Sequence, residues 1–167
     1  MPKSEQGITL DRFMVIPRTL IFVTRADQVL LIKGAPAKRL WANLYNGIGG
    51  HIEPGEDALS AARRELAEET GLQALDLRQV GTIFIDAGQP VGILLLVFRG
   101  RYAGGEVVAS SEGQLEWVPL ARLEDYPLVA DLRLLLPRVL AMQPGEPPFA
   151  ARSFYDEHDQ QQLVFNQ

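Results

Sequence analysis

Residues 50–72 constrain the fold more than any other part of this chain, because they contain one amphipathic helix flanked by glycines. Glu65, Glu68 and Glu69 lie three and four residues apart, so a helix over about residues 57–70 places all three carboxylates on one face. The opposite face carries a narrow apolar stripe made of Ala58, Leu59, Ala62 and Leu66. We therefore predict a helix that packs down on its apolar stripe and holds its acidic face in a fixed place.

The acidic face needs a positive partner. Like charges at helical spacing destabilise an isolated helix by about 0.2–0.5 kcal/mol per pair, and no Lys or Arg occurs between Glu65 and Gly71. Mg²⁺ or Mn²⁺ would neutralise the three carboxylates, because these ions take oxygen ligands and usually arrive with substrate phosphates. A solvated acidic surface is the alternative, since charged side chains are rarely buried. The apolar stripe and the flanking glycines favour the metal site.

The glycines that flank the helix have separate uses. Gly71 is a good C-terminal stop, because glycine tolerates the left-handed conformation that ends many helices. Gly49 and Gly50 come before the helix, where they allow the backbone to approach a ligand closely and leave its carbonyl groups available.

The spacing of these residues resembles the signature of the Nudix hydrolases. The matching positions are Gly50, Glu56, Arg64, Glu65, Leu66, Glu68, Glu69, Gly71 and Leu72, with no departure from the pattern. This resemblance implies an α+β protein with the Nudix α/β/α sandwich and a mixed β-sheet, formed by a single domain over residues 1–167. It also leaves a homodimer open.

The resemblance implies roles for individual residues. Glu65, Glu68 and Glu69 would ligate the metal, often Mg²⁺, together with the backbone carbonyl of Gly49. Arg64 would orient the acidic cluster through its fixed guanidinium fork. Glu56 would support the site.

A further ligand or general base is expected beyond this segment. Residues 111–117 resemble the stretch that supplies an additional acidic group in MutT-type members, which makes Glu112 the candidate. The alternative for Glu112 is a loop carboxylate in water, and Glu65 is the alternative for the base.

The base-binding residues are predicted from a narrower resemblance, to the oxidised-purine nucleoside triphosphatases of the family. Asn46 matches a residue that contacts the base there, and an Asn side chain can pair with a purine edge through its donor and its acceptor. Tyr126, before Pro127, and Asp131 correspond to residues that close the base pocket. The alternatives are a turn residue for Asn46 and a helix N-cap for Asp131.

Three cations on or after the second predicted strand are candidates for contacting phosphates. They are Lys33, Lys38 and Arg39, and solubilising surface charge is the alternative for each.

These observations predict a metal-dependent pyrophosphohydrolase that converts a nucleoside triphosphate, for example 8-oxo-dGTP, to a monophosphate and pyrophosphate. The markers of the coenzyme A and NADH types of Nudix enzyme are absent. Pro90 lies close to the position of an ADP-ribose marker, so hydrolysis of ADP-ribose is the alternative reaction. A catalytically silent nucleotide-binding module is the alternative of a different class.

Composition limits the remaining possibilities. The chain has 167 residues, 47% hydrophobic and 22% charged, with a net charge of −5 and no cysteine. An acidic protein lacks the electrostatic footprint for duplex nucleic acid. The absence of cysteine removes disulfides and thiolate chemistry and fits a reducing compartment, so we expect a cytoplasmic protein. The longest apolar run, residues 91–98, is too short to span a bilayer.

The rest of the chain predicts strands interleaved with two helices, which favours a mixed sheet covered on both faces. The expected strands are residues 13–24, 28–33, 77–86, 91–102 and 114–118, followed by a hairpin of residues 149–155 and 161–165. The second helix is expected over residues 128–142, with a kink or early break at Pro137.

Overall fold

The fold is built on one mixed sheet of eight strands. The structure is a computed structural model, which describes residues 2, 5–7, 9, 11–37, 40–108 and 113–166. The strands follow the order β3-β2-β1-β5-β4-β7-β8, and β6 pairs with β2. Their bounds are β1 Met14–Arg25, β2 Gln28–Gly34, β3 Tyr45–Asn46, β4 Ala74–Ile85, β5 Val91–Tyr102, β6 Gly113–Pro119, β7 Phe149–Tyr155 and β8 Gln161–Phe165.

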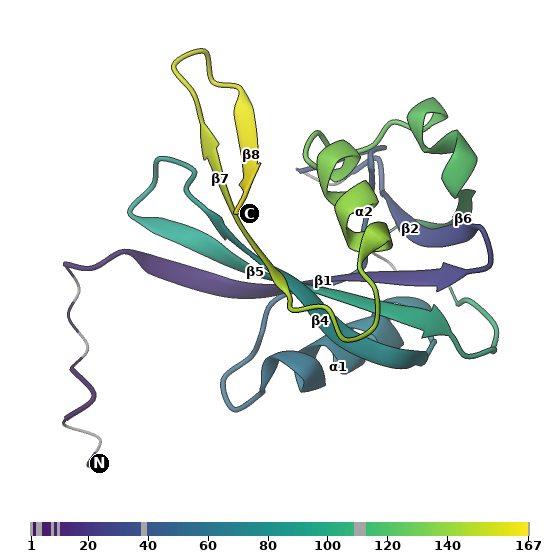
Figure 1. The fold of residues 1–167 in the computed structure, drawn as a ribbon, viewed down its shortest axis with the longest axis horizontal. Helices are drawn as coiled ribbons and strands as arrows, with labels where there is room; N and C mark the ends of the chain where they lie inside the picture. Colours follow the sequence, from purple (N-terminus) through teal and green to yellow (C-terminus); the bar gives the residue numbers. More distant parts are fainter. Residues whose placement is uncertain are drawn as a thin grey trace.

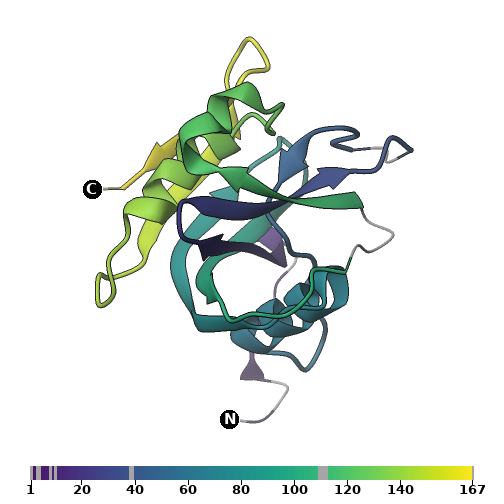
Figure 2. The same cartoon turned by 90° about the vertical axis from the view of Figure 1, so that its right-hand side faces the viewer.

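Helices cover both faces of this sheet. Helix α1 (Ala58–Thr70) and helix α2 (Leu132–Ala141) lie on opposite sides of it, as Figures 1 and 2 show, and a short 3₁₀ helix, η2 (Leu120–Asp125), follows β6. Strand β1 explains the two layers, because its side chains alternate between the faces. Leu20 and Phe22 join the core under α2, whereas Ile21 and Val23 join the core under α1. The predicted mixed sheet with helices on both faces is confirmed.

Strands β1 and β2 separate soon after the turn that joins them. They pair at Thr24↔Val29 and Arg25↔Gln28, after which β1 runs parallel to β5 and β2 runs antiparallel to β6. Residues 48–52 enter the opening and pair with β1. The Thr19 N–H donates to the Gly50 carbonyl at 2.8 Å, and the Ile21 N–H donates to the Ile48 carbonyl at 2.7 Å. The backbone around the paired glycines is therefore held against the middle of the sheet.

Helix α1 begins and ends where its sequence predicts. The Asp57 carboxylate accepts hydrogen bonds from the backbone N–H of Leu59 at 2.9 Å and of Ser60 at 3.0 Å, which satisfies two amides in the first turn. At the other end Gly71 has φ of 71° and donates its N–H to the Ala67 carbonyl at 2.9 Å. These two caps fix the length of the helix and so the direction of its acidic face.

The prediction for the second helix is wrong at its start. Residues 128–131 precede α2, because the chain on both sides of Leu128 pairs with Tyr45 of β3 before the helix begins. The Tyr45 N–H donates to the Pro127 carbonyl at 2.8 Å, and the Val129 N–H donates to the Tyr45 carbonyl at 3.0 Å. Of the kink or early break expected at Pro137, the early break does not occur, since α2 continues through that residue to Ala141. Leu135, Leu136 and Val139 are buried around it and hold this part of the helix down.

No helix among the residues just described is long and apolar enough to cross a membrane.

Candidate active site

A cavity of about 830 Å³ opens between the sheet, helix α1 and the segment before α2. Glu65, Glu68 and Glu69 of α1 line it at one place, next to Gly49 and Gly50. Its remaining lining includes two of the predicted base-binding residues, Asn46 and Asp131. The fold thus brings the acidic helix face and these two polar residues, which are far apart in the sequence, to one cavity.

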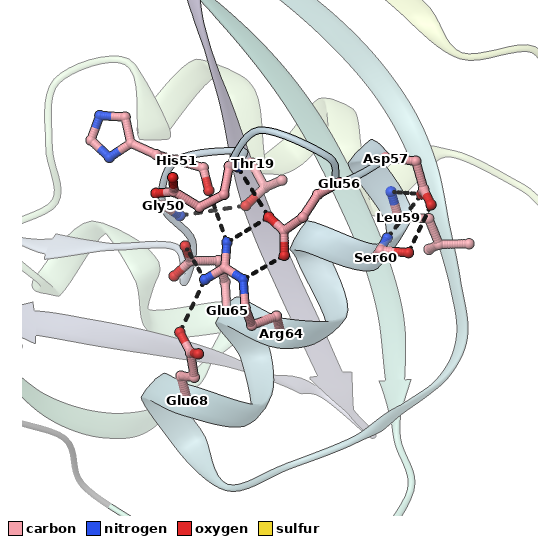
Figure 3. A network of polar contacts seen from close by, with 11 residues as sticks. Thr19, Gly50, His51, Glu56, Asp57, Leu59, Ser60, Arg64, Glu65 and Glu68 are labelled. Carbon is pink, nitrogen blue, oxygen red and sulfur yellow. Dashed lines mark hydrogen bonds and ion pairs between the residues drawn. The ribbon is translucent and has the colours of Figure 1, made fainter.

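Arg64 binds three carboxylates at once, as Figure 3 shows. Its Nε and Nη2 donate to the two oxygens of Glu56 at 2.7 and 2.9 Å. Its Nη1 donates to Glu65 Oε1 at 2.9 Å and to Glu68 Oε2 at 3.0 Å. Nη2 also donates to the backbone carbonyl of His51 at 3.0 Å, which ties residues 48–52 to α1.

This network corrects one expectation from the sequence. The acidic face does have a positive partner, because Arg64 precedes Glu65 by one residue and still reaches Glu68 one turn further on. The hydrogen bonds from Arg64, helped by one from the Glu53 N–H, lower the pKa of Glu56 to about 2. The same contacts raise the pKa of Arg64, so the guanidinium keeps its charge.

The paired glycines give the carboxylates room. A side chain on Gly50 would place its Cβ 2.5 Å from Glu65 Oε1, and one on Gly49 would lie 2.2 Å from the Thr19 carbonyl oxygen. Gly49 also has φ of 145°, a conformation that favours glycine. Its N–H donates to Glu69 Oε2 at 3.2 Å, which fixes the third carboxylate of α1 against the loop.

The donor set fits a hard divalent cation. Glu65, Glu68 and Glu69 offer carboxylate oxygens to one cavity beside a glycine backbone, and such oxygens are the ligands that Mg²⁺ and Mn²⁺ prefer. Arg64 uses one oxygen of Glu65 and one of Glu68, so it leaves the second oxygen of each uncontacted by its guanidinium. Within the described part of the chain no three His, Cys, Asp or Glu side chains are already gathered closely enough to hold a metal ion.

Asn46 and Asp131, the two predicted base-binding residues that line the cavity, are partly buried. Asn46 Oδ1 accepts a hydrogen bond from the Gly47 N–H at 2.8 Å. The side-chain NH₂ group of Asn46 is the group that can donate to a ligand. Burial raises the pKa of the Asp131 carboxyl, and a side-chain hydrogen bond from Gln161 partly opposes that shift. Asp131 takes the N-cap position of α2 without capping it through its side chain.

Two predicted substrate contacts do not line the cavity. Tyr126 donates its hydroxyl to Glu116 Oε1 at 2.9 Å and packs edge-on against Tyr45 at 5.1 Å between ring centroids. Lys33 Nζ lies 5.7 Å from the centre of the Tyr45 ring. Tyr45 donates to the other oxygen of Glu116, and its burial with this bond raises its pKa to about 12. Tyr126 and Lys33 therefore lie beside Tyr45 of β3. Glu112, Lys38 and Arg39 lie outside the described residues.

The NUDIX domain profile matches residues 14–139 of the chain. This chain belongs to the Nudix family. It is 33% identical over 123 residues to the oxidized purine nucleoside triphosphate hydrolase of Danio rerio, covering 73% of this chain and 78% of that one. It is 29% identical over 136 residues to the NAD-capped RNA hydrolase NudC of Pseudomonas syringae pv. tomato, covering 80% of this chain and 47% of that one.

The chain thus spans about half the length of the NudC relative. Among solved structures, the MutT protein of Bacillus halodurans superimposes with a TM-score of 0.76 at 23% identity, covering 91% of this chain and 98% of that one. The Nudix fold predicted from residues 50–72 is therefore confirmed, and the protein is an enzyme of the Nudix hydrolase family.

The lining residues of this Nudix cavity that the analysis of the sequence did not assign to the site include Arg18, Trp41, Tyr155 and Gln161. A charged residue within the apolar run of residues 13–24 was a usable signal for Arg18. Trp41 was visible as a lone aromatic in a loop. Tyr155 and Gln161 carry no local signal, because they reach the cavity only through the pairing of β7 with β4 and of β8 with β7.

Proposed function

We propose that this Nudix enzyme is a metal-dependent pyrophosphohydrolase that cleaves a nucleoside triphosphate to a nucleoside monophosphate and pyrophosphate. The proposed substrate is an oxidised purine nucleotide such as 8-oxo-dGTP. One observation carries this proposal: a single cavity is lined both by the carboxylates of α1 and by Asn46 and Asp131. A nucleotide has the two chemistries that such a cavity would meet, a polyanionic chain and a flat polar base.

The carboxylate end would hold Mg²⁺, or Mn²⁺, through Glu65, Glu68 and Glu69. The Gly49 carbonyl and Glu112 are proposed as further ligands. A bound ion of this kind supplies neutralisation of phosphate charge and a bound water of lowered pKa. Hydrolysis of a phosphoanhydride depends mainly on positioning and charge neutralisation, so a protein with this arrangement needs little further chemistry.

The chain's own residues prepare that end. Arg64 holds Glu65 and Glu68 in place by hydrogen bonds of 2.9 and 3.0 Å, and the Gly49 N–H holds Glu69. Positioning of ligands by neighbouring groups typically changes metal affinity or activity by about 10–100-fold. The general base is either Glu65 or Glu112, as the resemblance to other family members implies.

The base end would recognise a purine edge. The Asn46 amide can donate to a base carbonyl or ring nitrogen. Burial raises the pKa of Asp131, so its carboxyl remains protonated to higher pH than usual and can then donate a hydrogen bond as well. The relative from Danio rerio, named for oxidized purine nucleoside triphosphates, supports this choice of substrate.

A second candidate is a dinucleotide or nucleotide sugar, such as the NAD cap or ADP-ribose. The similarity to NudC favours it, although that relative is about twice as long as the matched region.

A nucleotide panel tests the proposal. Purified protein is incubated with 8-oxo-dGTP, the normal deoxynucleoside triphosphates, ADP-ribose and NADH, with Mg²⁺ or with EDTA, and products are separated by chromatography. We expect Mg²⁺-dependent release of pyrophosphate and the monophosphate, with the highest kcat/KM for the oxidised purine. A higher kcat/KM for ADP-ribose or NADH than for every triphosphate would contradict the substrate assignment.

A further inference from the structure

We propose that Arg18 binds a phosphate group of the substrate inside the cavity, a role that rests on the proposed function. Arg18 lies in the middle of β1 and lines the same cavity as the carboxylates of α1. It is not part of residues 50–72, and nothing in the signature of that segment involves it.

No hydrogen bond or ion pair joins the guanidinium of Arg18 to any residue that the structure describes. Its Nε is buried without a hydrogen bond, and it is the sole buried side-chain nitrogen or oxygen in this condition among the residues the structure describes. Most buried polar groups in proteins are hydrogen-bonded, and an unsatisfied one destabilises the folded state. A group of this kind is expected where a ligand completes the bonding.

The charged residues that line the cavity also support an anionic ligand for Arg18. Of the described residues that line the cavity, Arg18 is the one Arg or Lys, whereas the acidic members are Glu53, Glu65, Glu68, Glu69 and Asp131. No ion pair joins Arg18 to any described carboxylate, although several share its cavity. An anionic ligand would supply the missing partner, and the planar fork of arginine suits two phosphate oxygens.

The position of Arg18 matches a chain of phosphates. Arg18 forms a bridge with His51, and its neighbour Thr19 bonds to Gly50, so its backbone adjoins the glycines beside the α1 carboxylates. On the other side, Arg18 is in register with Leu95 of β5. Leu95, Ile93 and Ile85 give the cavity an apolar floor, where a charge-assisted hydrogen bond is stronger than in water. A phosphate chain that begins at the α1 carboxylates would pass this guanidinium.

The test compares ligands with and without phosphate. Titration calorimetry measures the affinity of wild type and Arg18→Gln, with Mg²⁺ present, for inorganic pyrophosphate, a non-hydrolysable triphosphate analogue and the matching nucleoside. We expect R18Q to lower the affinity for both phosphate ligands by roughly tenfold to a hundredfold, because a charged hydrogen bond is lost. The affinity for the nucleoside should change by less than about twofold. The affinity of Arg18→Lys for the phosphate ligands should lie between those of wild type and R18Q, because lysine keeps the charge and lacks the planar fork of arginine.

A matched control and a stability measurement keep the outcome interpretable. Arg12→Gln removes the same charge from a side chain that is 82% exposed, and it should leave all three affinities unchanged. Arg18→Met keeps the apolar stem and removes the unsatisfied nitrogen, so we expect it to raise the Tm of the ligand-free protein. If R18Q fails to fold, Arg18→Met and Arg18→Lys carry the same binding comparison.

Two results would overturn the role of Arg18: unchanged affinity for pyrophosphate and triphosphate, or an equal loss for the nucleoside. Failure of the proposed function gives a different result, since wild-type protein would then hydrolyse no triphosphate while its affinity for pyrophosphate still depends on Arg18.

Discussion

Arg64 and Glu56 are joined by two hydrogen bonds of 2.7 and 2.9 Å, although they are eight residues apart and only Arg64 lies on helix α1. The pair fastens the loop before the helix to the acidic face. Because the remaining nitrogen of Arg64 also binds Glu65 and Glu68, one guanidinium sets the position of the loop and of two proposed metal ligands together.

Replacing Arg64 by Lys should therefore impair the site while the fold remains. A lysine ammonium cannot span the two oxygens of Glu56 and also reach Glu65 and Glu68. We expect kcat/KM to fall by roughly 10–100-fold. The Mg²⁺ concentration that gives half-maximal activity should rise. Arg63→Lys, on the exposed neighbouring position, is the control. Steady-state kinetics across Mg²⁺ concentrations give the measurement, and normal Mg²⁺ dependence in R64K would contradict the idea.

Glu56 should make stability depend on pH. Its pKa is lowered from 4.5 to about 2, so the folded protein binds fewer protons than the unfolded chain between these values. The stabilisation is thus fully present above pH 4.5 and is lost as the pH falls toward 2. In urea unfolding, Glu56→Gln should be less stable than wild type at pH 7, with the difference shrinking on acidification. Glu157→Gln, an exposed site, should show no such trend.

Metal binding should stabilise the protein through the α1 carboxylates. Saturation at about 100 times the Kd raises the free energy of unfolding by about 2.7 kcal/mol for a ligand that binds only the folded state. We expect Mg²⁺ to raise the Tm of wild type, EDTA to reverse the rise, and Glu68→Gln or Glu69→Gln to abolish most of it. Glu106→Gln, whose exposed side chain does not line the cavity, is the control. A full Mg²⁺ effect in both variants would remove these residues from the metal site.

Asp131 should lower the stability of the folded protein at neutral pH, because its carboxyl group is partly buried. Burial raises its pKa, so the folded protein holds this proton more tightly than the unfolded chain does. Stability therefore falls as the pH rises from about 3.9, the usual value for Asp, through the raised pKa. Asp131→Asn should be more stable than wild type at pH 7 and lose this advantage below about pH 4.

The same variant tests the base pocket. Asp131→Asn should raise the KM for 8-oxo-dGTP. It should also change the ratio of kcat/KM for 8-oxo-dGTP to kcat/KM for dGTP. An equal effect on the oxidised and the normal nucleotide would mean that Asp131 shapes the cavity without reading the base.

Local order along the chain was predictable wherever its cause is local. Helix α1 begins after Asp57 and ends before Gly71, because each of these caps forms hydrogen bonds with backbone groups within four residues. The alternation of Leu20 and Ile21 between the two core layers follows from the pleat of a strand. The spacing of the α1 carboxylates likewise follows from the helical repeat.

Contacts between distant segments needed the folded chain. Val129 was expected within a helix, yet its N–H donates to the carbonyl of Tyr45 in β3, a partner more than eighty residues away. Arg18 is a charged residue within an apolar strand, and its place in the cavity depends on β1 lying beside β5. Gln161 meets Asp131 because β8 pairs with β7, which lies next to β4.

The sequence by itself determined the acidic helix and its glycine stop, because helical periodicity and capping act over a few residues, and the motif of residues 50–72 identified the Nudix family. Only the tertiary structure decided what shares a cavity with that helix. The order of strands in the sheet, and the packing of α2 across it, place Asn46, Asp131 and Arg18 around one space. Such neighbours are set by strand pairing between remote segments, which leaves no periodic trace in the chain.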